Sequence, residues 1–470
     1  MISDELIYQI LQDFGFAPTN EQRQALEVFA RFMTARSDRE VMIMRGSAGT
    51  GKTSLAGAIV KTLVRLGQKV VLMAPTGRSA KVFALNAGQK ASTIHRKIYR
   101  QRGLGDDFNL NANLHHDTLF MIDEASMISN QFHDSVFGSG SLLDDLVQYV
   151  YEAGHNCRML LLGDQAQLPP VGETESPALQ ADVLRCYGLH VSECDLNEVL
   201  RQSQQSGILY NATRIREGSA EAVVLPKIRL QGFADIRSVP GDELIETLNT
   251  SYGEVGTDET MVITRSNKRA NIYNQGIRNT ILGREEELCP GDMVMVVKNN
   301  YFHSKEIEFI ANGDRARVQR VRNVRQLYGF RFADVWLQFP DYDNTELQST
   351  VILDSLASEA PALTREQNEA LFQAVMDDYA DIPRKPDRLK AIKNDRHFNA
   401  LQVKYAYATT CHKAQGGQWA HVYIDQGYMT DEMLTPDYIH WLYTAFTRAS
   451  EQLFLVNWPH SQTETTETER

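Results

Sequence analysis

The sequence predicts an α/β protein built on parallel sheets. Three short apolar runs are typical of buried strands, and each leads into a polar or glycine-rich loop: Val41–Met44, Leu119–Ile122 and Met159–Leu162. Segments with helical periodicity lie between them, such as Ser54–Leu66. Alternating strands and helices favour a parallel sheet whose ligand lies at the carboxyl ends of the strands.

The loop after the first strand has the pattern of a phosphate-binding loop. Gly46, Gly49 and Gly51 let the backbone curl so that successive N–H groups point inward, and the following helix adds positive potential at its N-terminus. Lys52 can then reach the β- and γ-phosphates, and the Thr53 hydroxyl can ligate Mg²⁺. We expect ATP with Mg²⁺ to be bound by Gly46, Ser47, Ala48, Gly49, Thr50, Gly51, Lys52, Thr53 and Ser54.

Polar residues also follow the second and third strands. Asp123 is expected to hold Mg²⁺ through its water shell, and Glu124 to orient and deprotonate the attacking water. After the third strand, Gln167 is placed to sense the γ-phosphate. The alternative for this third loop is a surface turn shaped by Gly163 and two prolines, which would not explain why polar residues recur at strand ends.

Composition limits the class of protein. A chain of 470 residues favours about three domains, and its five cysteines are scattered without a Cys-x-x-Cys pair, which argues against structural zinc and a disulfide framework. No apolar run reaches the ~18 residues of a membrane span, and the first residues do not form a signal-peptide core, so we expect a cytoplasmic protein without membrane contact. The net charge of −12 would confine nucleic acid to a local groove.

Seven further motifs stand in a fixed order around these loops. They are Thr19-x-x-Gln22, Ala74–Lys81, Ala91–His95, Leu196–Gln202, Val262–Asn267, Tyr407–Gln418 and Tyr443–Ala449. In this order and spacing the chain resembles the superfamily 1 helicases of the RecD and Dda branch, and the resemblance covers nearly the whole sequence. Thr19-x-x-Gln22 is at the same time the pattern of a helix capping box.

The resemblance implies a fold and its domains. We expect two RecA-like motor domains, the first at 1–200 and the second at 201–289 plus 404–460. A β-hairpin pin is expected within the first domain at 97–117, and an SH3-like barrel with a helical arm, most like Dda, within the second at 290–403. In this second insert the residue pattern predicts strands at Met293–Val297, Arg315–Val321 and Phe330–Phe339, turns at Asn312–Asp314 and Asp341–Asn344, and a helix capped by Thr364-x-x-Gln367. Residues 461–470 are expected to form a flexible tail.

The resemblance also assigns roles in the ATP site. Gln22 would read the adenine, Gln418 would contact the ribose, and Arg201 and Arg448 would be arginine fingers. Such cations matter because charge spreads over the γ-phosphoryl oxygens in the transition state. If the second domain supplies Arg448 across a cleft, hydrolysis depends on closure of that cleft.

A single strand bound without base preference needs a basic, polar groove with stacking surfaces. The residues expected to supply it are Pro75, Thr76, Thr93, His95, Phe108, Thr410, His412 and Lys413. His95 and His412 could equally be structural histidines. Phe108 or Leu104 is expected near the pin tip, against the terminal base pair, with a plain surface hairpin as the alternative. The helical arm would brace the pin or simply project into solvent.

These features predict an ATP-dependent DNA helicase that moves 5′ to 3′ on single-stranded DNA, with the direction implied by the resemblance alone. We expect a monomeric motor at duplex junctions in DNA replication, repair or recombination, with possible single-strand-binding or nuclease partners. Two alternatives stay open: the motor subunit of an exodeoxyribonuclease V type complex, and an ATP-switched clamp or remodeller that does not unwind. RNA as the track is also open.

Overall fold

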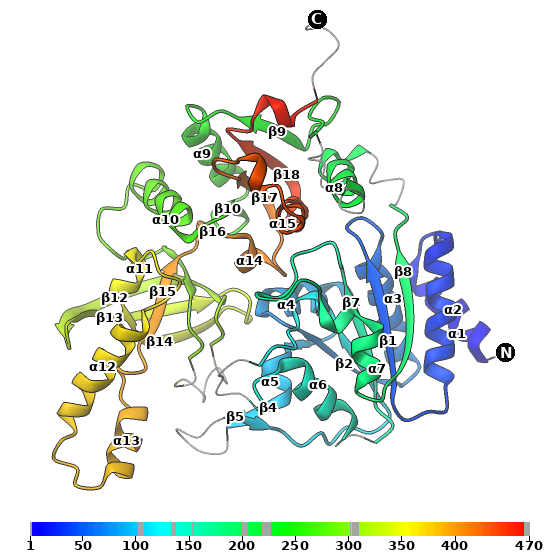
Figure 1. The fold of residues 1–470 in the computed structure, drawn as a ribbon, viewed down its shortest axis with the longest axis horizontal. Helices are drawn as coiled ribbons and strands as arrows, with labels where there is room; N and C mark the ends of the chain where they lie inside the picture. Colours follow the sequence, from blue (N-terminus) through cyan, green and yellow to red (C-terminus); the bar gives the residue numbers. More distant parts are fainter. Residues whose placement is uncertain are drawn as a thin grey trace, which may run out of the picture.

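The structure is a computed structural model that describes residues 2–101, 108–132, 138–152, 155–199, 205–218, 227–300, 302 and 310–464. Figure 1 shows two sheet-containing lobes with a small barrel beside them and a pair of helices projecting beyond the barrel. The predicted residues Arg201 and Leu104 lie outside the described residues.

The first lobe contains a six-stranded sheet in the order β3-β2-β6-β7-β1-β8, whose neighbouring strands are parallel. Its strands are β1 (Glu40–Gly46), β2 (Lys69–Ala74), β3 (Ala91–Thr93), β6 (Thr118–Ile122), β7 (Arg158–Gly163) and β8 (His190–Leu196). The three apolar runs of the sequence form β1, β6 and β7, which confirms the predicted parallel α/β sheet.

Helices cover both faces of this sheet. They are α1 (Ile2–Phe14), α2 (Asn20–Thr34), α3 (Lys52–Arg65), α4 (Gly77–Ala87), α5 (Ile94–Ile98), α6 (Leu142–Tyr151) and α7 (Ala181–Cys186). Successive side chains of a strand point to opposite faces. Accordingly, Val41 and Ile43 pack in the cluster that contains α6 residues, while Met42 and Met44 pack in the cluster built on α1, α2 and α3. Thr19 and Gln22 form the predicted capping box of α2.

The second lobe holds a five-stranded parallel sheet in the order β16-β10-β17-β18-β9. Its strands are β9 (Ile236–Val239), β10 (Thr260–Thr264), β16 (Ala408–Thr410), β17 (Trp419–Asp425) and β18 (Ala449–Val456). The associated helices are α8 (Gly207–Gly218), α9 (Leu244–Glu254), α10 (Asn267–Gly276), α14 (Cys411–Ala414) and α15 (Pro436–Phe446). Helix α8 packs against α15 and β18, so it belongs to this lobe.

A closed barrel lies in the sequence between β10 and β16. It consists of β11 (Met293–Val296), β12 (Arg315–Leu327), β13 (Phe330–Phe339), β14 (Thr345–Ile352) and β15 (Leu401–Tyr405). The predicted small barrel is therefore confirmed, although its β14 was not among the predicted strands. The predicted turn before β14 has Asp343 and Asn344 at φ of 53° and 57°, a region that Asn and Asp tolerate.

Three helices connect β14 to β15: α11 (Asp354–Ala357), α12 (Arg365–Asp378) and α13 (Lys385–Lys393). Thr364 and Gln367 form the predicted capping box at the start of α12. Leu371, Val375 and Ile392 pack with Phe332 of the barrel, which fixes the base of the arm, and Figure 1 shows α12 and α13 extending away from it.

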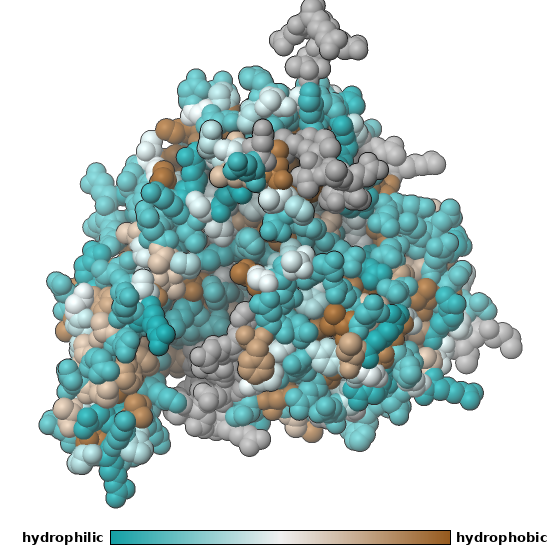
Figure 2. Space-filling model, in the orientation of Figure 1, coloured by the Kyte–Doolittle hydropathy of each residue, from teal (hydrophilic) through white to brown (hydrophobic). Residues whose placement is uncertain are grey.

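A separate two-stranded antiparallel sheet joins β4 (Tyr99–Gln101) to β5 (Phe108–Leu110). These are the two arms of the predicted hairpin, but its tip, residues 102–107, lies outside the described residues. Figure 2 shows a face on which hydrophilic side chains dominate. In the described part of the chain, no helix combines the length and apolar character needed to span a bilayer.

Candidate active site

The phosphate-binding loop joins the end of β1 to the start of α3. Gly49 and Gly51 have φ of 78° and 77°, the left-handed region that favours glycine. A Cβ on Gly46 would lie 3.1 Å from Thr50 Oγ1 and 3.2 Å from Lys52 Cβ, closer than ordinary packing allows. Backbone conformation therefore favours glycine at 49 and 51, and close packing favours it at 46; the loop lies at the strand-to-helix turn that the sequence predicted.

Gln22 connects α2 to this loop. Its Nε2 donates to the Thr50 carbonyl oxygen at 2.8 Å, its Oε1 accepts from the Thr19 N–H at 3.0 Å, and its side chain is fully buried. The capping role and a contact with the phosphate loop are thus both present. Both ends of the amide are bonded within the protein, so a contact with adenine stays a prediction.

Asp123 and Glu124 follow β6, beside the loop. Burial raises the pKa of Asp123 to about 6, against the opposing effect of the Lys52 charge, and its Oδ1 accepts from the Glu124 N–H at 2.9 Å. Glu124 has φ of 53°, a conformation that is strained for a residue with a side chain. Its Oε2 is buried and has no hydrogen-bond partner among the described residues. Buried polar atoms are rarely left without a partner, so this carboxylate is poised for a group from outside the protein.

The loop after β7 brings two more polar groups to the same edge of the sheet. Asp164 is buried, which raises its pKa, while the nearby Lys52 charge acts in the opposite direction. Gln167 is 6% exposed, and within the described structure its buried Oε1 accepts no hydrogen bond. This arrangement is compatible with the predicted sensing of a phosphate by Gln167, which stays a prediction.

Helix α15 of the second lobe reaches the phosphate loop directly. The Tyr443 hydroxyl donates to Asp164 Oδ2 at 2.6 Å and accepts from the Ala48 N–H at 3.0 Å. One turn of the helix therefore contacts both the phosphate loop and the loop after β7. Neither Tyr443 nor Asp164 was among the predicted site residues, although Tyr443 begins the Tyr443–Ala449 motif and Asp164 lies in the loop after the third predicted strand.

Further contacts join the same two lobes. The Leu168 N–H donates to Thr444 Oγ1 at 2.8 Å, and Gln415 Nε2 donates to the Leu168 carbonyl oxygen at 2.5 Å. His440 Nδ1 lies 2.9 Å from the Ala166 carbonyl oxygen. The candidate ATP site thus lies at the junction between the lobes, where side chains of the second lobe contact the loops around the phosphate loop.

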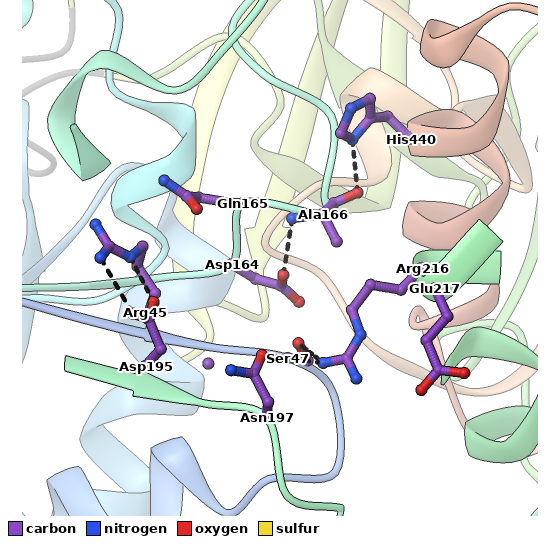
Figure 3. Close-up of a pocket in the computed structure, with 11 residues that line it drawn as sticks. Arg45, Ser47, Asp164, Gln165, Ala166, Asp195, Asn197, Arg216, Glu217 and His440 are labelled. Carbon is purple, nitrogen blue, oxygen red and sulfur yellow. Dashed lines mark hydrogen bonds and ion pairs between the residues drawn. The ribbon is translucent and has the colours of Figure 1, made fainter. Parts of the chain in front are cut away.

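A cavity of 410 Å³ opens at this junction (Figure 3). The side chain of Arg216, from α8 of the second lobe, points into it and donates to Ser47 Oγ. The lining residues are Arg45, Gly46, Ser47, Asp164, Gln165, Ala166, Asp195, Asn197, Arg216, Glu217 and His440.

Arg448 is 2% exposed and lies inside the second lobe. Its guanidinium donates to the carbonyl oxygens of Thr444 and Gly417 and to Thr447 Oγ1, each at 3.1 Å. All three partners lie in its own lobe, so in this conformation the side chain braces the end of α15. Its predicted role at the γ-phosphate stays a prediction, and it requires the guanidinium to leave these partners.

Two family models match the chain. Residues 18–231 match the AAA domain, and residues 405–456 match the UvrD-like helicase C-terminal domain; together they cover just over half of the sequence. These matches contain the phosphate loop, the carboxylates after β6 and the α15 motif. The chain is similar to the superfamily 1 helicases of the RecD and Dda type.

Its curated relatives in this family are distant. The ATP-dependent RecD2 DNA helicase of Deinococcus radiodurans is 25% identical over 67% of this chain and 41% of its own length. The ATP-dependent DNA helicase dda of Enterobacteria phage T4 is 23% identical over 59% of this chain and 60% of its own length. The chain thus spans less than two thirds of either relative. A solved structure of Pif1 helicase from Bacteroides, in complex with ADP-AlF3 and ssDNA, aligns with 97% of this chain over 96% of its own length. The two chains are 16% identical, and the TM-score is 0.47.

On the first lobe, the predicted DNA contacts have structural roles. Thr76, which follows Pro75 after β2, accepts from the Ser79 N–H and caps α4. Thr93 is buried and caps α5. Burial lowers the pKa of His95 to about 4, so its imidazole is neutral at pH 7, and its ring lies 5.7 Å from that of Tyr99. Contacts with DNA at these positions stay predictions.

The second lobe places Thr410, His412 and Lys413 at the start of α14, where burial lowers the pKa of both His412 and Lys413. This segment lies close to the first lobe, since a Cβ on Gly416 would lie 2.8 Å from Ser79 Oγ and 3.1 Å from Thr76 Oγ1. The structure therefore brings the Thr76 turn and the segment after β16 together across the lobe junction. Gln418 is exposed beside them.

Proposed function

We propose that this chain is an ATP-dependent DNA helicase that moves 5′ to 3′ on single-stranded DNA and unwinds duplex ahead of it. The observation that carries the proposal is the Ala48–Tyr443–Asp164 connection. A nucleotide bound at Ala48 must displace or rearrange a hydroxyl that belongs to the other lobe. Occupancy of the site is therefore coupled to the position of the second lobe, which is what a translocating motor requires.

Two relatives support this activity, because both are named as ATP-dependent DNA helicases. In the proposed reaction Lys52 binds the terminal phosphates and Glu124 accepts a proton from the attacking water. Thr53 and Asp123 are the residues that would hold Mg²⁺, which fits a loop hydroxyl and a buried carboxylate beside an unpaired Glu124 oxygen. The metal, when bound, would neutralise charge on the β- and γ-phosphates.

The DNA path proposed here follows the lobe junction that carries Thr76 and Gly416. The β4–β5 hairpin would act as the pin, and the barrel, which we propose to be SH3-like, would face the same strand. The short antiparallel arms of the hairpin support this assignment, because they hold residues 102–107 between them.

The deciding experiment measures ATP hydrolysis and strand separation on single-stranded DNA, single-stranded RNA, and duplexes with a 5′ or a 3′ tail. We expect hydrolysis to be stimulated by single-stranded DNA, and unwinding only of the duplex with the 5′ tail. Hydrolysis without separation of any duplex would support a clamp instead. Unwinding that needs a 3′ tail would contradict the proposed direction, and equal unwinding of RNA duplexes would contradict the choice of DNA.

A second prediction concerns the pin. Replacing both Leu104 and Phe108 with alanine is expected to preserve DNA-stimulated ATP hydrolysis within about twofold, while unwinding of a forked duplex falls by about tenfold or more, since a lost base-stacking contact removes ~1–3 kcal/mol. Leu114→Ala, on an exposed side chain after the hairpin, is the matched control and is expected to unwind normally. Full unwinding by the double variant would contradict the pin assignment.

A further inference from the structure

Arg216 stands out because it crosses the lobe junction. It lies near the end of α8, which packs on α15 and β18 of the second lobe, yet its side chain donates to the hydroxyl of Ser47 in the phosphate loop of the first. Figure 3 shows its guanidinium beside Ser47, and Asn197 Oδ1 is 3.5 Å away on the same side. A long cationic side chain from the second lobe thus already touches the loop that binds phosphate.

Arg216 enters the cavity that opens at the phosphate loop. The same cavity is lined by Gly46, Ser47 and Asp164. The Arg216 charge also acts on the Tyr443 hydroxyl, since it opposes the rise in the pKa of that group. Tyr443 in turn contacts the Ala48 N–H. Arg216 is therefore close to a backbone donor that the phosphates are expected to use.

Other arginines near the junction are held within one lobe. Arg45 also lines the cavity, but it forms ion pairs with Glu193 at 2.8 Å and Asp195 at 2.6 Å, all in the first lobe. Arg448 is bonded entirely within the second lobe. Of these three, Arg216 is the one whose side chain already extends from one lobe to the phosphate loop of the other.

We propose that Arg216 is a cation from the second lobe that contacts the terminal phosphate of bound ATP, exchanging the Ser47 hydroxyl for phosphate oxygens. The exchange is favourable because hydrogen bonds from a guanidinium to an anion are stronger than those to a neutral hydroxyl, and phosphate can accept two of them. ADP lacks that phosphate, so Arg216 would distinguish the two nucleotides and report the state of the site to α8. This inference rests on the proposed ATP-binding function.

The test compares three variants of the full-length chain. Arg216→Ala removes the cation, and Arg216→Lys keeps the positive charge but replaces the planar guanidinium with a single ammonium group. Arg214→Ala is the matched control, because Arg214 lies on the same helix but forms a half-exposed ion pair with Glu464. Circular dichroism checks that each variant is folded. Binding of ADP and of a non-hydrolysable ATP analogue is measured by titration, and kcat and KM for ATP by steady-state kinetics.

We expect Arg216→Ala to lower kcat by about 10³-fold, as for other arginines that stabilise a transferring phosphoryl group. The same variant should bind the ATP analogue about tenfold more weakly than the wild type, since a charged hydrogen bond contributes ~1.5–3 kcal/mol. Its affinity for ADP should stay within about twofold of the wild-type value. Compared with Arg216→Ala, Arg216→Lys should recover part of the lost affinity for the ATP analogue and little of the lost kcat. Arg214→Ala should match the wild type in every measurement.

The outcomes separate this inference from the proposed function. If the wild type hydrolyses ATP and Arg216→Ala does so equally well, with an unchanged preference for the ATP analogue over ADP, the role of Arg216 is overturned. If the wild type binds the analogue but hydrolyses nothing, the proposed function fails, and the loss of ATP preference in Arg216→Ala still supports the contact. If the wild type binds neither nucleotide, both proposals are overturned.

Discussion

Replacing Glu124 with glutamine is expected to lower kcat for ATP by about 10²–10⁴-fold, the range that a positioned general base contributes. Glutamine keeps the shape of the side chain but accepts no proton from water. The position has two signs of a catalytic role: the backbone is in the left-handed region at φ of 53°, and the buried Oε2 has no partner in the described structure. Strain and unpaired polar atoms of this kind gather at functional sites.

The measurement is steady-state ATP hydrolysis with saturating single-stranded DNA, together with titration of a non-hydrolysable ATP analogue. Binding of the analogue should stay within about threefold of the wild type, because Glu124 is proposed to act on the water and not on the phosphates. Glu152→Gln, an exposed carboxylate at the end of α6, is the matched control and should leave kcat unchanged. A Glu124→Gln variant with wild-type kcat would remove Glu124 from the mechanism.

Replacing Asp292 with alanine is expected to destabilise the protein by about 3–5 kcal/mol, the usual cost of leaving a buried charge without its partner. Asp292 is fully buried and directly precedes β11. Arg278 donates from Nε to Oδ1 and from Nη2 to Oδ2 of Asp292, each at 3.0 Å. Arg284 Nη1 donates to Oδ1 at 2.5 Å. The Tyr407 hydroxyl also donates to it at 2.9 Å. The cluster lies where the barrel meets the second sheet.

Chemical denaturation followed by circular dichroism and tryptophan fluorescence tests this expectation. The control is Glu287→Gln, which breaks the 2.8 Å ion pair with Arg331 on the surface and should change the free energy of unfolding by less than ~1 kcal/mol. A second variant, Asp292→Asn, keeps the shape of the side chain, and its loss of unfolding free energy should lie between those of Asp292→Ala and Glu287→Gln. An unfolding midpoint equal to that of the wild type in Asp292→Ala would show that the buried arginines find other partners.

Much of the architecture was predictable from local patterns. The apolar runs that form β1, β6 and β7, the glycines of the phosphate loop, and the capping boxes at Thr19 and Thr364 all depend on neighbours a few residues apart. The alternating pattern after Met293 also predicted the barrel. Strand β14 was missed, and the tip of the hairpin lies outside the described residues.

The sequence by itself determined the chemistry of the phosphate loop, because loop curvature and the positions of Lys52 and Thr53 follow from glycine spacing at a strand-to-helix turn. Only the tertiary structure decided which side chains of the second lobe reach that loop. Tyr443 meets Ala48 across 395 positions of chain and Arg216 meets Ser47 across 169, while Arg448 turns inward to the carbonyl oxygen of Gly417. Such contacts depend on how two separate sheets and their helices pack against each other, and no local spacing specifies that packing.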